Sequence, residues 1–365
     1  MIRVCLFKFM FLTQLSTIYT EGCDSFKSTN VSASVHMDDE LKFYVVNGCL
    51  EPKDLEGGLV QRVIVHSKIT RLGKDSIRNL PKLEWLSIQQ NSLEILEPQA
   101  FRNVPSLKWV ILKENNLKEI PKDVFNLVPT ISRLYLSSNK IDFIASGAFS
   151  NMESLEGIIL TDNALTYWNR DWFENCPKLK YIRFSGNKIS VIPRRAFASL
   201  PSLLGIDFTR NKITIIQPDA FQNLKSLVYL NLNLNGLTVL DERAFPNKIH
   251  IENLIINNNR LNYLPDKLLS KLSVGTIFMD PNPWKCQCLQ RIHDWLFFTS
   301  GSVDVSSHNC RTPYGPICVV ARGKACEESV DEDSTRRYIG HLRTLTQSLG
   351  LGEKCAFLFS QTVVQ

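Results

Sequence analysis

Residues 107–120 read LKWVILKENNLKEI, a frame of apolar positions written Leu-x-x-Leu-x-Leu-x-x-Asn-x-Leu-x-x-Ile. The frame returns along the chain, and its asparagine recurs eight times at a spacing of 24 residues. A phenylalanine follows ten residues after seven of these asparagines, from Phe101 to Phe245. A fixed period of this length indicates a repeat architecture. The asparagines are Asn91, Asn115, Asn139, Asn163, Asn187, Asn211, Asn235 and Asn259.

Each repeat is expected to contribute one short strand. Around Val110 and Leu112 the apolar side chains alternate with the intervening ones, which is the periodicity of a strand with one buried face. A single repeat cannot bury its own apolar face, so neighbouring repeats must stack and both ends must be covered. The pattern therefore predicts a solenoid in which the strands form a parallel sheet.

The asparagine and phenylalanine rows are interpreted as structural. An amide that follows the strand can donate and accept hydrogen bonds where the turn leaves backbone groups without partners. Removing one such amide should cost about 1 to 3 kcal/mol. The phenylalanines are expected to stack on the convex side, between successive turns.

This frame resembles the extracellular leucine-rich-repeat family, of the 24-residue Toll-like and Slit-like type. The resemblance covers about residues 59–326. It implies an α/β leucine-rich-repeat solenoid, a horseshoe with a parallel concave β-sheet, capped by disulfides at both ends. The same resemblance implies binding to extracellular proteins, such as receptors, ligands, immune factors or adhesion proteins.

The two ends of the repeat region carry the predicted caps. Before the first full repeat, Val60, Val63 and Val65 form a degenerate strand unit, preceded by Cys23 and Cys49. These two cysteines are expected to form one disulfide, although the family's N-terminal cap often has four cysteines. We expect the N-terminal cap over 21–58 and the repeats over 59–272.

At the far end, the string Asn-Pro-Trp-x-Cys-x-Cys spans residues 282–288 and looks like the family's C-terminal cap, expected over 273–326. By that resemblance Cys286 pairs with Cys310, Cys288 with Cys326, and Cys318 with Cys355. Spacing alone cannot choose among the 15 pairings that six cysteines allow. A zinc site is disfavoured, because Cys-x-Cys is not the usual metal knuckle.

The first 20 residues read as a signal peptide, with an early arginine and a mostly apolar run that is short for a membrane span. No later stretch has the length of a membrane span, so we expect a secreted, extracellular protein. Removal of the signal takes Cys5 with it and leaves an odd number of cysteines. Cys176 is the expected free thiol and a small core residue.

Several function classes are disfavoured. The charge of +6 comes from 42 basic and 36 acidic residues without dense basic clusters, so nucleic acid is not the expected partner. The histidines are scattered and no catalytic motif appears, so we expect no enzyme activity, no cofactor and no metal.

The candidate site lies on the strand residues that alternate with the core. These positions have no structural reason to be large, yet aromatic, aliphatic and arginine side chains gather there, and such residues are enriched at binding hot spots. The alternative is that the side chains brace one another across the sheet. The predicted partner-binding residues are Trp85, Trp109, Ile111, Arg133, Tyr135, Ile159, Tyr181 and Arg183.

Two further features complete the prediction. The sequon Asn30-Val31-Ser32 predicts a glycan at Asn30, upstream of the solenoid and clear of the concave face. The tail over 327–365 has Tyr338, Leu342, Leu345 and Leu349 at helical intervals, so it is expected either to pack on the C-terminal cap or to contact a partner.

The sequence thus favours a secreted protein that binds a protein partner through the concave face, in immune, signalling or adhesion recognition. The alternative is a structural matrix component, or a homodimer, that uses its caps or convex edge.

Overall fold

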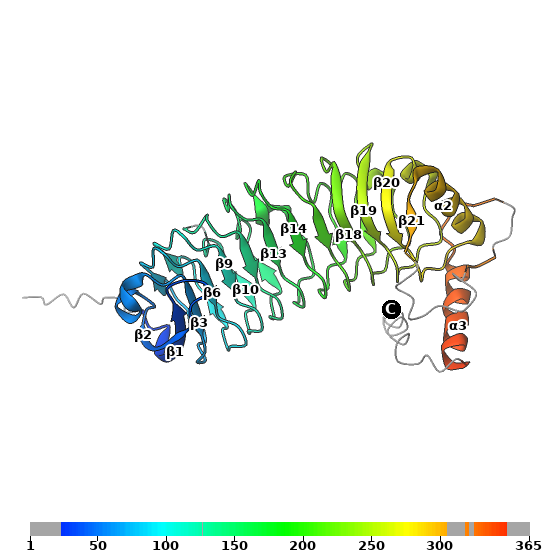
Figure 1. The fold of residues 1–365 in the computed structure, drawn as a ribbon. Coiled ribbons are helices and arrows are strands. Elements are labelled where there is room, and N and C mark those ends of the chain that lie inside the picture. The colour runs from blue at the N-terminus through cyan, green and yellow to red at the C-terminus, as the bar shows by residue number, and fades with distance from the viewer. Residues whose placement is uncertain (1–22, 126, 305–317, 321–324, 349–365) are drawn as a thin grey trace, which may run out of the picture.

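The computed structural model describes residues 23–125, 127–304, 318–320 and 325–348. The repeats stack into one elongated solenoid with a cap at each end (Figure 1). The predicted signal peptide over 1–20, Cys310 and Cys355 lie outside the described residues.

One large sheet runs the length of the solenoid. Thirteen strands are hydrogen-bonded in the order β2-β1-β3-β6-β9-β11-β13-β14-β16-β18-β19-β20-β21. From β3 onward the neighbours are parallel, and Leu86, Val110 and Leu134 stand in register, one repeat apart. The bounds are β3 Arg62–Val65, β6 Trp85–Ser87, β9 Trp109–Ile111, β11 Arg133–Tyr135, β13 Gly157–Ile159, β14 Tyr181–Arg183, β16 Gly205–Asp207, β18 Ser226–Asn231, β19 Ile249–Ile255, β20 Leu272–Phe278 and β21 Ser302–Val303.

Short strand pairs form after the chain has turned away from the large sheet. The pairs are parallel and join neighbouring repeats. Their bounds are β4 Arg71–Leu72 with β7 Ile95–Leu96, β10 Glu119–Ile120 with β12 Phe143–Ile144, β15 Val191–Ile192 with β17 Ile215–Ile216, and β5 Ile77–Arg78 with β8 Phe101–Arg102. Single turns of helix fill other connections: η1 Pro52–Asp54, η2 Glu56–Gly58, η3 Arg170–Phe173, η4 Glu242–Ala244 and α1 Asp266–Leu269.

The phenylalanine row is buried and stacked, as predicted. Ring centroids lie 5.7 Å apart for Phe101 and Phe125 and 4.8 Å apart for Phe221 and Phe245. In the middle of the row Trp168 inserts, 5.6 Å from Phe173 and 5.1 Å from Phe197. Its indole N–H donates to the carbonyl of Ala196 at 3.1 Å, so the large ring is buried without an unpaired donor.

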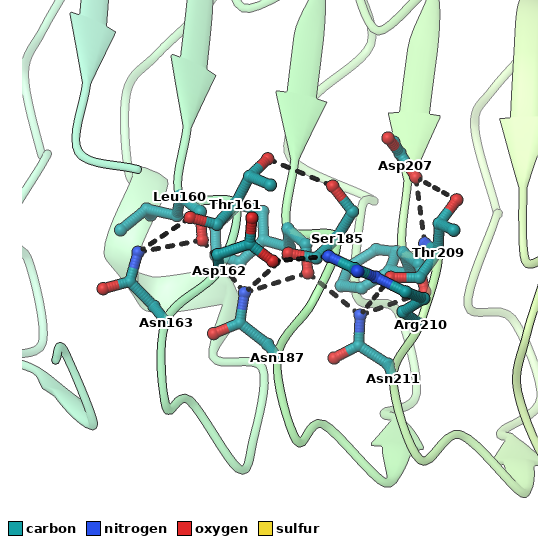
Figure 2. A network of polar contacts seen from close by, with 12 residues as sticks. Leu160, Thr161, Asp162, Asn163, Ser185, Asn187, Asp207, Thr209, Arg210 and Asn211 are labelled. Atoms are coloured by element: carbon teal, nitrogen blue, oxygen red, sulfur yellow. Dashed lines mark hydrogen bonds and ion pairs between the residues drawn. The ribbon is translucent and has the colours of Figure 1, made fainter. Parts of the chain in front are cut away.

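The asparagine row is a continuous hydrogen-bonded ladder (Figure 2). The Nδ2 of Asn187 donates to the carbonyl of Leu160 in the preceding repeat at 2.9 Å and to that of Phe184 at 3.0 Å. Its Oδ1 accepts the backbone N–H of Leu165 at 3.0 Å. One side chain thus closes its own turn and ties it to the repeat before, which confirms the structural role.

A left-handed residue precedes every asparagine of the ladder. These residues have φ between 53° and 67°, a conformation that costs most side chains about 1 kcal/mol or more. Glycine holds the position once, at Gly186, where an added Cβ would collide with the carboxylate of Asp162. The eight residues are Gln90, Glu114, Ser138, Asp162, Gly186, Arg210, Leu234 and Asn258.

The N-terminal cap is an antiparallel hairpin that extends the large sheet. Strands β1, Phe26–Ser34, and β2, Lys42–Gly48, pair with each other, and β1 also pairs with β3. A disulfide joins Cys23 to Cys49, as predicted. The cap covers the apolar end of the first repeat and leaves β2 at the edge of the sheet.

The C-terminal cap is built on helix α2, Cys286–Thr299. The disulfide between Cys288 and Cys326 confirms the prediction, but Cys286 pairs with Cys318. The predicted pairs of Cys286 with Cys310 and of Cys318 with Cys355 are therefore wrong. The backbone explains the difference, because Cys286 donates to the carbonyl of Val319 at 3.0 Å and so holds residue 318 beside residue 286.

Helix α3, Glu332–Ser348, lies in the stretch expected to be helical, and the cap holds its beginning. Asn262 accepts the backbone N–H of Asp331 at 2.8 Å and donates to the hydroxyl of Thr335 at 3.2 Å. The buried Lys285 donates to the carbonyl of Ser329 at 3.0 Å. Tyr338 is 6% exposed, and this burial raises the pKa of its hydroxyl, as does the charge of Asp280. These contacts match the cap-packing alternative.

Replacing Asn187 with Ala should lower the free energy of unfolding by about 1 to 3 kcal/mol, because buried carbonyl and N–H groups lose their partner. Asn187→Asp should cost more, since a carboxylate would face two backbone carbonyls. Urea denaturation measures both changes, and hydrogen exchange should reveal faster exchange at the Leu165 amide. Asn116→Ala, at a partly exposed asparagine outside the ladder, is the control. Wild-type stability in both Asn187 variants would contradict the ladder's role.

Cys176 is a free, buried thiol whose Sγ donates to the carbonyl of Phe149 at 3.0 Å. Burial raises its pKa to about 11. At about pH 8 only roughly one thiol in a thousand would then be ionised, and the thiolate is the reactive form. Iodoacetamide should leave the Cys176 peptide unlabelled in the native protein and label it in guanidinium, as read by mass spectrometry. Rapid native labelling would contradict the core assignment.

Candidate partner-binding surface

The concave face is here the side of the large sheet opposite the buried Leu and Phe rows. Strand register arranges its residues in two neighbouring rows that hold all eight predicted site residues. The first row contains Arg62, Trp85, Trp109, Arg133, Gly157, Tyr181, Gly205 and Tyr229. The second contains Phe43, Ser32, Ile64, Ser87, Ile111, Tyr135, Ile159 and Arg183.

Two tryptophans form the N-terminal part of the predicted site. The rings of Trp85 and Trp109 lie 5.7 Å apart at an angle of 43°. The guanidinium of Arg62 lies 5.8 Å from the Trp85 ring and the Nζ of Lys108 lies 5.9 Å from the Trp109 ring. Each such cation contributes about 0.5 to 1 kcal/mol at an exposed site. The pair is thus held in place before any partner arrives.

Arg133 is positioned by its neighbours as well. It forms an ion pair with Glu156 at 3.0 Å, and Glu156 also contacts Lys180 at 3.4 Å. Burial alone would raise the pKa of Glu156, but hydrogen bonds from Lys180 and Arg133 outweigh it and lower the pKa. Gly157 leaves room for the arginine, because a Cβ there would lie 3.1 Å from the Cδ of Arg133.

A second aromatic pair lies further along the first row. Tyr181 and Tyr229 are nearly parallel at 6.4 Å, although they belong to repeats that are not adjacent. They meet above Gly205, where any side chain would collide with the Tyr229 ring. Arg183 donates to the Tyr229 hydroxyl at 3.4 Å. Tyr229 therefore extends the predicted site. The sequence signal for its contact with Tyr181 was the glycine that stands between them in the first row, Gly205.

These contacts correspond to the alternative in which the concave side chains brace one another. The tryptophans and tyrosines are half-buried, and Ile111 is only 9% exposed. These contacts still leave a surface that a partner can reach, because several of the side chains keep part of their area exposed to solvent. They are Trp85, Trp109, Tyr135, Ile159 and Tyr181. The structure thus places the site residues together but leaves their use in binding a proposal.

The concave face continues onto the N-terminal hairpin, which the sequence reasoning missed. Phe43 is 77% exposed and Val45 is 60% exposed, both on the solvent side of β2. Asn30 lies on the same side, directly opposite Val45, with His66 on its other flank. The expectation that a glycan at Asn30 would be clear of this face is therefore wrong. The sequence signal for this apolar surface was the pair of alternate residues Phe43 and Val45 within Lys42–Gly48.

A second row of mostly apolar residues lies four residues after each asparagine, and five of its eight members are on the short strands. We call it the lateral row; Ile95, Phe143 and Ile215 in it are 50%, 49% and 54% exposed. This periodic signal was present in the sequence and was not used. Its members are Ile95, Glu119, Phe143, Tyr167, Val191, Ile215, Val239 and Tyr263.

In the middle of the solenoid, polar side chains that follow β13, β14 and β16 bind one another (Figure 2). Arg210 forms an ion pair with Asp162 at 2.6 Å, two repeats away, across Gly186. Thr161 and Ser185 share a hydrogen bond of 3.0 Å. These groups have partners within the protein, so they offer less to a ligand than the aromatic part does.

Two negative observations concern the described part of the chain. No group of three or more His, Cys, Asp or Glu side chains there could hold a metal ion. No helix among those residues is both long and apolar enough to cross a membrane.

Family comparisons agree with the repeat geometry. The profile of the BspA-type leucine-rich-repeat region matches residues 70–204 in six copies, and a leucine-rich-repeat profile matches residues 177–237. This chain is a leucine-rich-repeat protein. Its repeats are 24 residues long, and two disulfides close its cysteine-rich C-terminal cap within the described residues. No curated protein matches this leucine-rich-repeat protein in sequence.

Solved structures share the fold of this leucine-rich-repeat protein. A chain in the mouse RP105/MD-1 complex is 20% identical over 65% of it, with a TM-score of 0.54. A chain in the Drosophila Toll–Spatzle complex is 20% identical over 73% of it, with a TM-score of 0.53. The matches cover 41% and 39% of those chains, so this protein spans less than half their length. A chain in a complex of TLR13 with ssRNA13 matches over 58% at 20% identity, covering 32% of that chain, with a TM-score of 0.48.

The Trp85–Trp109 contact can be tested by a double-mutant cycle. Trp85→Ala and Trp109→Ala should each lower the free energy of unfolding, and the double variant should lose less than the sum. The coupling should be about 0.5 to 1.5 kcal/mol, the range for paired aromatic rings. Urea denaturation of the four proteins measures it, with Trp85 and Tyr229 as a distant control pair. Strict additivity for the tryptophans would contradict the bracing contact.

Proposed function

We propose that this protein is a secreted recognition module that binds a partner protein through the N-terminal half of its concave face. One observation carries the proposal: a half-buried, pre-positioned row of Trp, Tyr and Arg side chains on a sheet whose other face already supplies the core. These residue types dominate binding hot spots. Held in place by their neighbours, they lose little conformational freedom on binding.

Within the concave face, we assign partner binding to the segment from Trp85 to Arg183. Its aromatic and aliphatic residues adjoin across neighbouring strands, about 4.8 Å apart. Arg133 and Arg183 lie among them and can pair with acidic groups of a partner. After Arg183 the second row carries Asp207 and Asn231, and beyond Tyr229 the first row carries Asn253 and Thr276. Apolar side chains return in the second row only at Ile255 and Phe278.

Export is supported by the disulfides. In the described part of the chain three disulfides close the two caps, and such bonds persist in oxidising compartments. The apolar N-terminal segment supports the same conclusion. Immune, signalling and adhesion recognition all suit such a module.

The second candidate is a structural or dimeric role that uses the lateral row. Ile95, Phe143 and Ile215 expose about half of their side chains, more than the concave aromatics do. Glu119 interrupts the row between Ile95 and Phe143, but exposed apolar residues that recur on one surface can mark a contact site. A second copy of this chain is the partner in that case, which light scattering after size exclusion would detect as a stable dimer.

The two candidates make opposite predictions for binding. The partner is first captured from the extracellular fluid of the secreting organism and identified by mass spectrometry. Trp85→Ala, Trp109→Ala and Tyr135→Ala should then each weaken its affinity by about 30-fold, or 2 kcal/mol, the hot-spot scale.

Phe143→Ser and Ile215→Ser are the matched controls, and surface plasmon resonance with folded variants is the measurement. If the control substitutions abolish binding while the concave ones leave it unchanged, the concave proposal is wrong and the lateral row takes its place.

A further inference from the structure

The exposed apolar residues of the N-terminal hairpin need an explanation that the repeats do not give. Phe43 and Val45 project from β2 on the concave side with 77% and 60% of their surface exposed. The ring of Phe43 lies 5.9 Å from that of His66, and both line a hollow of about 390 Å³ together with Asn30, Tyr44 and Val45. So much apolar area at a sheet edge invites association with other chains.

The asparagine of the chain's Asn-x-Ser sequon lies at the edge of that hollow. Asn30 is exposed, directly opposite Val45 on β2 and flanked by His66, the residue that follows β3. Cross-strand neighbours have Cβ atoms about 5 Å apart, and the diagonal neighbour Phe43 is about 7 to 8 Å away. A sugar attached to the Nδ2 of Asn30 would therefore lie within reach of Val45, His66 and Phe43.

We infer that an N-linked glycan at Asn30 fills this hollow, with its first N-acetylglucosamine packed on Phe43 and Val45. A pyranose ring has one face made of C–H groups, and the N-acetyl methyl adds further apolar surface, so the sugar can cover an aromatic ring while its hydroxyls remain in water. The inference rests on the proposed export of the chain, because this modification occurs in the secretory pathway.

The structure also fixes when the sugar must be added. Ser32, the third residue of the sequon, is fully buried, and its hydroxyl is 2.8 Å from the Nε2 of His66. The sequon is therefore accessible only before the hairpin folds. Once attached, the glycan would cover the N-terminal end of the concave face and leave the rows from Trp85 onward open to a partner.

The test uses the full chain, secreted from cells that keep N-glycans in the high-mannose form. Glycopeptide mass spectrometry should find Asn30 occupied in nearly all molecules. Endoglycosidase H then leaves a single N-acetylglucosamine on Asn30, whereas Asn30→Gln carries no sugar at all. The trimmed protein should bind the apolar dye ANS as weakly as the untrimmed protein does, and Asn30→Gln should bind several-fold more.

Phe43→Ser is the matched control, because without the ring the loss of the sugar should change dye binding little. An exported, disulfide-bonded chain with a bare Asn30 would overturn this inference and leave the recognition proposal intact. Equal dye binding by the trimmed protein and Asn30→Gln would also overturn it. A chain that is not exported would contradict the proposed secretion instead.

Discussion

The architecture depends on the amide of one asparagine in each repeat. Shortly after the strand of each of these repeats the chain passes through a residue in the left-handed region. The asparagine that follows donates to carbonyls of its own and the preceding repeat and accepts a backbone N–H, as Asn187 does. The cost of the left-handed residue, about 1 kcal/mol, is offset by these buried hydrogen bonds. Since the same turn recurs at every repeat, the chain must coil, and the strands must stand in register.

Coiling separates the side chains of each strand by function. One set of alternate residues enters the core, where the leucine and phenylalanine rows bury it from every side. The other set faces outward in rows that run across all repeats, and no packing requirement fixes its chemistry. The resulting freedom is what allows Trp85, Trp109, Tyr135 and Tyr181 to gather on the concave face. The glycines at 157 and 205 then let Arg133 and Tyr229 lie across the sheet.

Most of the fold followed from the sequence because it rests on local periodicity. The 24-residue spacing predicted the parallel sheet, the asparagine ladder and the buried Cys176, and each is present. The pairing of Cys286 with Cys318 did not follow, since it depends on a backbone contact between residues 286 and 319 that no spacing reveals. The position of Asn30 was misjudged for a similar reason: a hairpin joining the sheet through antiparallel pairing leaves no trace in the repeat. For the site, the alternation of core and outward side chains along each strand predicted the two rows of the concave face. The contact between Tyr181 and Tyr229 above Gly205 could not be predicted in this way, because it depends on the register between repeats that are not adjacent.

The central claim is that the outward rows of the large sheet, and no other surface, receive the partner. Hydroxyl-radical footprinting of the free and the partner-bound protein, read by mass spectrometry, tests it at individual side chains. The account predicts that Trp85, Trp109, Tyr135 and Tyr181 become protected in the complex while Ile95, Phe143 and Ile215 are oxidised as before. Protection of the latter three residues, with unchanged oxidation of the aromatic rows, would contradict it.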